Sequence, residues 1–157
     1  MAMSEEALKR IVDVGQRLID SARSLHLSGI AKSIEQEEGC QIFIAPFDNA
    51  GPNIKCTCCV ATCESCIRPS LKESGIIQIN HHFVFYRPHP EDIEAERLGV
   101  AHGLAHCVLH WPLGPRRDRL VKGNFNGVDM YLVRFLEEEE AEADALACLL
   151  TAYRPAL

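Results

Sequence analysis

The chain has 157 residues, 47% of them hydrophobic and 24% charged, and a formal net charge of -6. This length suits one domain, so residues 1–157 are expected to form a single unit with its own core. The acidic balance argues against direct nucleic-acid binding. No signal-like or bilayer-length apolar run is present, which predicts a soluble, cytoplasmic protein with no membrane association. In that compartment the eight cysteines indicate metal ligation, redox chemistry or buried thiols rather than disulfides.

The first part of the chain predicts two helices and a strand. Apolar residues at helical spacing follow Ser4, a favourable N-cap residue, and predict an amphipathic helix. A second, shorter helix is expected over 28–38, where Gly39 stops it. Residues 40–47 then contain branched and aromatic side chains and predict a strand that ends near Pro46.

The rest of the chain predicts two more strands and two helices. Runs at 75–80 and 83–88 are strand-like and meet near His81 and His82, which favours a small antiparallel sheet. Pro90 and the acidic residues after it open a helix that runs through His110. A polar connection leads to a last helix over 131–154. The expected fold is therefore α+β, with a small antiparallel sheet packed against several helices.

Three histidines of the expected helix over 91–110 indicate a metal site. His102, His106 and His110 lie four residues apart, which places their imidazoles on one helix face. In the last helix Glu140 and Asp144 share a face, so that one can bind metal while the other orients a ligand imidazole. The alternative is that the histidines only pack and that the acidic run is a solvated helix face.

The segments "IIQIN", "AERLGVAHGLAHCVLH" and "EAEADALACLL" together resemble the ImmA/IrrE family of metallopeptidase-like domains over roughly residues 5–152. The resemblance implies a zincin-like metallopeptidase fold that binds zinc through His102, His106 and Glu140, with Asp144 as the supporting acid. Members act on helix-turn-helix repressors, which implies a protein partner and a transcriptional consequence; the sequence leaves the oligomeric state open. Two further residues match accompanying positions of the family pattern: Arg97 and His110.

Gly103 stands where the family pattern H-E-x-x-H has its glutamate. That glutamate is the general base, and losing a positioned base costs on the order of 10² to 10⁴ in rate. Glycine inside a helix is itself unfavourable by about 0.5–1 kcal/mol, so replacing it is expected to add slightly to stability. We interpret the chain as a catalytically impaired pseudopeptidase. The alternatives are a substitute base among residues 137–139, or a glycine introduced artificially at this position.

A Cys-rich insertion at about 54–68 is a second candidate centre. Thiolates this close together in a cytoplasmic protein bind zinc or an iron–sulfur cluster, although the spacing matches no zinc-finger or ferredoxin pattern. The alternative function is thus a metal- or redox-sensing module, and a purely structural interaction domain is a third. If no ligand is held, the segment is a loop of oxidisable thiols. Its cysteines are Cys56, Cys58, Cys59, Cys63 and Cys66.

Overall fold

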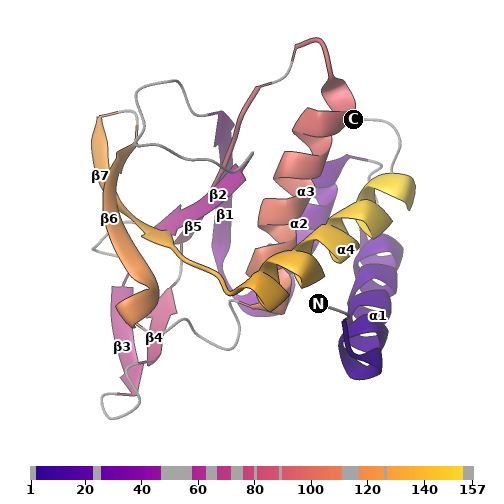
Figure 1. Cartoon of the computed structure of the whole chain (residues 1–157), viewed down its shortest axis with the longest axis horizontal. Coiled ribbons are helices and arrows are strands. Elements are labelled where there is room, and N and C mark those ends of the chain that lie inside the picture. The colour runs from indigo at the N-terminus through magenta and orange to yellow at the C-terminus, as the bar shows by residue number, and fades with distance from the viewer. Residues whose placement is uncertain are drawn as a thin grey trace.

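Four helices gather on one side of a five-stranded sheet (Figure 1). The computed structural model describes residues 3–22, 26–46, 58–62, 67–71, 76–79, 81–88, 90–110, 117–125 and 127–153. The helices are α1 (Glu5–Ser21), α2 (Leu27–Glu38), α3 (Ile93–Leu109) and α4 (Glu137–Tyr153), with a short 3₁₀ helix at Arg117–Arg119. The strands are β1 (Gln41–Pro46), β2 (Cys58–Thr62), β3 (Ile67–Leu71), β4 (Ile76–Ile79), β5 (His81–Tyr86), β6 (Leu120–Phe125) and β7 (Val128–Val133).

The main sheet is mixed, with the strand order β1-β5-β2-β7-β6. The α+β class is as expected, but the small antiparallel sheet is a wrong prediction, because β1 pairs with β5 in parallel. The two runs near His81 do not pair with each other either. β4 instead pairs with β3 in a separate two-stranded sheet, while β5 lies between β1 and β2. A parallel pair needs a long connection, which local sequence patterns do not reveal.

The starts and stops of the first three helices follow local chemistry. The Ser4 side chain accepts a hydrogen bond from the Ala7 N–H and caps α1. Gly39 ends α2 in a left-handed conformation with φ 65°. Asp92 caps α3 in the same way as Ser4 caps α1, by accepting from the N–H three residues later. The predicted boundaries of these helices are therefore confirmed to within a few residues.

The segment before α4 differs from the prediction. The last helix was expected from residue 131, but 128–133 form β7, and α4 begins at Glu137. β6 and β7 form an antiparallel hairpin. Its connection includes Gly127, whose φ of 84° suits a glycine. The expected polar connection between the two long helices thus contributes two strands to the main sheet.

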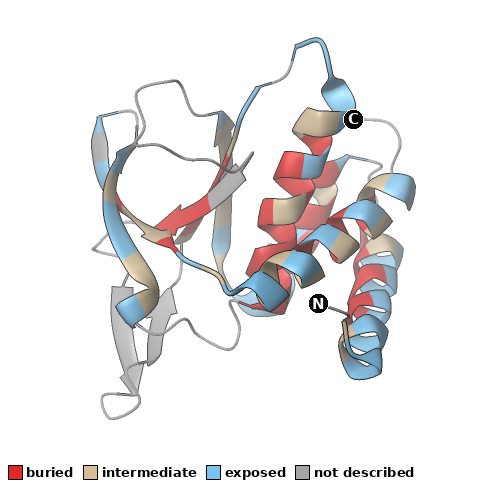
Figure 2. Ribbon diagram, viewed as in Figure 1, coloured by how far each residue is buried: buried red, intermediate tan, exposed pale blue. Residues whose placement is uncertain are grey.

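α3 lies between the sheet and α4 and is buried on most sides (Figure 2). It contacts β2 and β5 on one side and α2 and α4 on others. Such a helix is apolar around most of its circumference rather than amphipathic. Within the described part of the chain, no helix is both long and apolar enough to cross a lipid bilayer. Because α3 is largely buried, the polar side chains that it presents to α4 require hydrogen-bond or charge partners there.

His82 of β5 is buried on the face of the sheet that also carries Val84. Burial, with a smaller effect of His81, lowers its pKa from 6.5 to about 3. The unfolded chain therefore binds a proton here below pH 6.5, whereas the folded protein does not until about pH 3. This histidine is neutral in the folded protein over the whole of that interval.

We expect the free energy of unfolding to fall as the pH is lowered from about 6.5 towards 3, with His82 contributing about 1.4 kcal/mol per pH unit. The His82→Gln variant should show a shallower dependence when urea unfolding is followed at several pH values. His26→Gln, a change at an exposed position, should keep the wild-type slope. Equal slopes in wild type and His82→Gln would contradict the assignment.

Candidate metal centre

His102, His106 and Glu140 converge at the contact between α3 and α4. The two histidines come from successive turns of α3, and Glu140 comes from the first turn of α4. The Nε2 atoms of the histidines are 3.0 Å apart. Glu140 Oε1 lies 2.8 Å from His106 Nε2, and Glu140 Oε2 lies 3.4 Å from His102 Nε2. One ligand atom from each residue lies within 4.8 Å of the others, so the group has the composition and spacing of a metal site.

The outward nitrogen of His102 has its own acidic partner. Its Nδ1 lies 2.7 Å from Asp144 Oδ1, one turn along α4 from Glu140. A neutral imidazole that donates its Nδ1 proton to this carboxylate leaves the Nε2 lone pair free towards the centre. Asp144 therefore lies where the sequence placed the orienting acid.

The outward nitrogen of His106 leads into a second chain of contacts. His106 Nδ1 lies 2.8 Å from His110 Nδ1, and His110 Nε2 lies 2.9 Å from Glu142 Oε1. An ionised Glu142 only accepts hydrogen bonds, so a neutral His110 donates to it through Nε2 and accepts through Nδ1. His106 then donates its Nδ1 proton to His110 and also turns an Nε2 lone pair towards the centre.

Three ligand atoms thus face one another at short distances, and with both histidines neutral in this tautomer all three are acceptors. They are the Nε2 lone pairs of His102 and His106 and the carboxylate of Glu140. His106 is only 2% exposed, whereas the Glu140 side chain is 44% exposed, so the site is buried on the side of α3 and open to water on the side of α4. A positive charge at its centre, either a proton or a metal ion, stabilises such a cluster.

The pKa values of the three groups depend on burial and on their contacts with one another. Burial alone lowers the pKa of His102, but the hydrogen bonds and charges of Glu140 and Asp144 outweigh it and raise the pKa above its usual value. Burial lowers the pKa of His106 to about 4, against the opposing effect of Glu140. Hydrogen bonds from the two histidines hold the pKa of Glu140 well below its usual range.

The start of α4 fixes the position of Glu140. Glu139 accepts from the Leu136 N–H at 2.8 Å and from Arg119 Nη1 at 2.7 Å, which ties the helix start to the 3₁₀ helix. The first of these contacts is half of a capping box. Glu139 is one of the three candidate substitute bases, and both of these contacts are made to its Oε1 atom.

Two residues of the site were missed by the sequence analysis. Phe135 stacks on His106, with ring centroids 3.6 Å apart and planes inclined by 9°. Glu142 ends the chain of contacts that begins at His106. The neighbourhood of Glu142 contains several other acids, so spacing alone gave no reason to select it. Only the crossing of α4 over α3 decides which acid meets which histidine.

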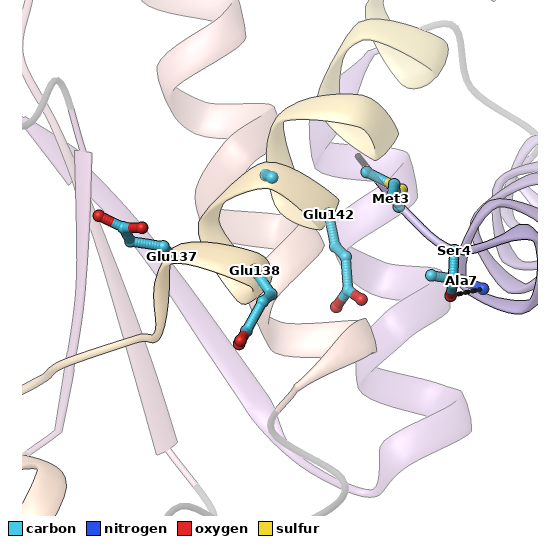
Figure 3. Close-up of a pocket in the computed structure, with 7 residues that line it drawn as sticks. Met3, Ser4, Ala7, Glu137, Glu138 and Glu142 are labelled. Atoms are coloured by element: carbon cyan, nitrogen blue, oxygen red, sulfur yellow. Dashed lines mark hydrogen bonds between the residues drawn. The ribbon is translucent and has the colours of Figure 1, made fainter. Parts of the chain in front are cut away.

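Glu142 also borders a pocket of about 480 Å³ between the beginnings of α1 and α4 (Figure 3). Met3, Ser4 and Ala7 of the N-terminal region form the opposite wall. In the close-up, Glu138 and Glu142 project from the same side of α4, whereas Glu137 points away from them. The contacts from His106 through His110 therefore lead from a buried imidazole to an open surface of the protein.

Gly103 packs directly against β5. A Cβ atom at this position would lie 2.4 Å from Val84 Cγ1, closer than real atoms approach. Val84 is completely buried. The expectation that replacing Gly103 adds to stability is therefore wrong, because the missing side chain is what lets α3 approach the sheet so closely.

Most of the predicted cysteine cluster lies outside the described residues, namely Cys56, Cys63 and Cys66. Cys58 and Cys59 are the first two residues of strand β2. This strand lies between β5 and β7, so residues 58–62 are part of the main sheet. Metal binding by the cluster stays a prediction.

No protein-family model matches this chain, and neither curated proteins nor solved structures include a match to it. The resemblance to the ImmA/IrrE family therefore depends on the residue pattern given above.

The close contact between Gly103 and Val84 predicts how substitutions at these two positions change the free energy of unfolding. We expect Gly103→Ala to lower the free energy of unfolding by about 1–3 kcal/mol, because the new methyl group overpacks the interface. In an exposed helix the same change raises it by nearly 1 kcal/mol. Val84→Ala makes room for the methyl group, so the double variant should be more stable than the sum of the single effects predicts, by about 1–2 kcal/mol. Urea unfolding of the four proteins measures this coupling, and strictly additive effects would contradict the close approach.

Proposed function

We propose that His102, His106 and Glu140 bind one zinc ion in a metallopeptidase-like domain of the ImmA/IrrE type. The observation that carries the proposal is the convergence of two imidazole Nε2 atoms and one carboxylate at the α3–α4 contact. Two histidines and one carboxylate are the ligand set of a common class of zinc hydrolases. Under this proposal the fold is zincin-like, with α3 as the helix that carries both histidines.

The distances support a tetrahedral ion. Atoms that bind one such ion at about 2.0–2.1 Å lie roughly 3.3 Å from one another. The three separations here, 3.0, 2.8 and 3.4 Å, lie close to that value. Both imidazoles present the same nitrogen, and both hold their second nitrogen in a hydrogen bond, as metal-bound histidines do. A salt bridge between two helices needs neither feature.

The residues have distinct roles under this proposal. A bound zinc supplies a Lewis acid and lowers the pKa of its water towards 7. Asp144 and His110 keep the protons on the outer nitrogens of His102 and His106, so that both Nε2 atoms stay available. Glu140 supplies negative charge. Gly103 offers no group that accepts a proton, so we infer that hydrolysis is weak and that the domain acts mainly by binding a regulatory protein such as a transcriptional repressor.

Zinc binding is tested by metal content after dialysis against micromolar zinc. We expect the His102→Ala variant to hold about one equivalent less than the wild type, since it removes one of three protein ligands. His26→Ala, which changes an exposed histidine away from the site, serves as the matched control and should hold the same zinc as the wild type.

The orienting acid gives a graded version of the same experiment. Asp144→Ala should retain the site but weaken zinc binding by about 10- to 100-fold, measured by competition with a chromogenic chelator. If zinc content and affinity are unchanged in both His102→Ala and Asp144→Ala, the metal lies elsewhere and the proposal is wrong.

The role of Gly103 is tested by restoring the base together with the space that it needs. In a Val84→Ala background, Gly103→Glu should raise hydrolysis of an unfolded protein substrate by up to 10²- to 10⁴-fold over Gly103→Gln. The glutamine variant has the same size but accepts no proton. Efficient hydrolysis by the zinc-loaded wild type would contradict the pseudopeptidase interpretation.

A further inference from the structure

The stack of Phe135 on His106 differs from two phenylalanine stacks in the main sheet. Its ring centroids are 3.6 Å apart and its planes are inclined by 9°. Because carbon atoms make contact at about 3.5 Å, such rings overlap with a lateral offset of at most about 1 Å. The centroids of Phe43 and Phe83 are 5.1 Å apart, and those of Phe83 and Phe85 are 6.2 Å apart. Phe135 therefore covers nearly the whole face of the imidazole.

Full overlap of two rings depends on their electron density. Two rings that both carry negative charge on their faces prefer to slide apart or to meet edge to face. The two phenylalanine stacks are offset in this way. Overlap is favourable when one ring is electron-poor, since the face of a phenyl ring attracts positive charge. An imidazole becomes electron-poor when it binds a metal ion or a proton, so the stack fits a His106 ring that carries positive charge.

The backbone on both sides of Phe135 is held by hydrogen bonds. The Arg134 N–H donates to the Arg119 carbonyl at 2.8 Å, and the Leu136 N–H donates to Glu139 Oε1 at 2.8 Å. The Phe135 ring also packs against the main hydrophobic core. These contacts fix the segment between β7 and α4 without help from the proposed metal ligands.

A ring fixed in this way restricts rotation of the His106 imidazole. One nitrogen of the imidazole lies 2.8 Å from His110 Nδ1, and the other lies 2.8 Å from Glu140 Oε1. If the imidazole turned out of its plane, it would collide with the Phe135 ring and lose both contacts. The stack therefore keeps Nε2 directed towards the centre.

We propose that Phe135 is a positioning residue of the zinc centre. Its face stabilises the electron-poor, metal-bound imidazole of His106 and holds Nε2 of that imidazole towards the ion. This inference rests on the proposed zinc function and adds a residue that binds no metal itself but raises the affinity of the site.

Zinc affinity of the full chain at neutral pH, measured by competition with a chromogenic chelator, tests this role. Replacing the Phe135 ring by a pentafluorophenyl ring nearly keeps its size and reverses the charge on its face. We expect zinc binding to weaken by about 5- to 30-fold, the effect of a desolvated cation–π contact. Phe135→Leu should weaken it similarly, because it removes the face. Phe135→Tyr keeps an electron-rich face and should bind zinc like the wild type.

A pentafluorophenyl ring at Phe83 is the matched control. Phe83 is also partly buried and stacked, but on phenylalanine rings, and its fluorination should leave zinc affinity unchanged. If Phe135 only fills space, its pentafluorophenyl variant should bind zinc as tightly as the wild type. That result, tighter binding, or an equal loss at Phe83 overturns the inference and leaves the proposed zinc site in place. If zinc binding by the wild type does not depend on His102, the proposed function fails and this inference fails with it.

Discussion

The contact between α3 and α4 carries three imidazole–carboxylate pairs, and the structure is organised around them. His102 faces Asp144, His106 faces Glu140, and His110 faces Glu142, at distances between 2.7 and 2.9 Å. α3 is buried between the sheet and α4, so its polar groups must be satisfied within this contact. The pairs at His102 and His110 satisfy outer nitrogens, whereas the pair at His106 brings a carboxylate to the two inner ones. This difference turns a row of imidazole–carboxylate pairs into a centre where three ligand atoms converge.

The burial of α3 also explains why the residue at position 103 affects both the packing of the helix and the proposed chemistry. On one side the helix presents His102 and His106 to α4, and on the other it lies against Val84 of β5. A glutamate at position 103 would have to fit into that second contact. The residue that removes a general base from the proposed centre therefore also permits close packing, and the two effects cannot be separated by a single substitution. The paired changes at Gly103 and Val84 separate them.

Local signals in the sequence predicted local structure well. Ser4 and Gly39 marked helix ends correctly because capping depends on the residue itself and its immediate neighbours. The four-residue spacing of the histidines placed them on one face of α3, and the family resemblance selected Glu140 from a run of acids. The Asn126–Gly127 dipeptide is a hairpin signal, whereas the predicted last helix extends back over β7.

Long-range arrangements were not available from the sequence. The parallel pairing of β1 with β5 and the central place of β2 depend on connections across the chain. Glu142, Phe135 and the clash that keeps position 103 a glycine all depend on how α3 crosses its neighbours. Arg97 matches a position of the family pattern, but its burial in α3 is evident only from the structure.

X-ray absorption spectroscopy of the protein loaded with one equivalent of zinc tests the central claim most directly. It separates the two candidate ligand sets, because zinc lies closer to nitrogen or oxygen ligands than to sulfur ligands. Binding by His102, His106 and Glu140 predicts a shell of nitrogen and oxygen atoms at about 2.0–2.1 Å, with the outer scattering of two imidazoles. A shell of sulfur atoms at about 2.3 Å would place the zinc on cysteines and would contradict the account.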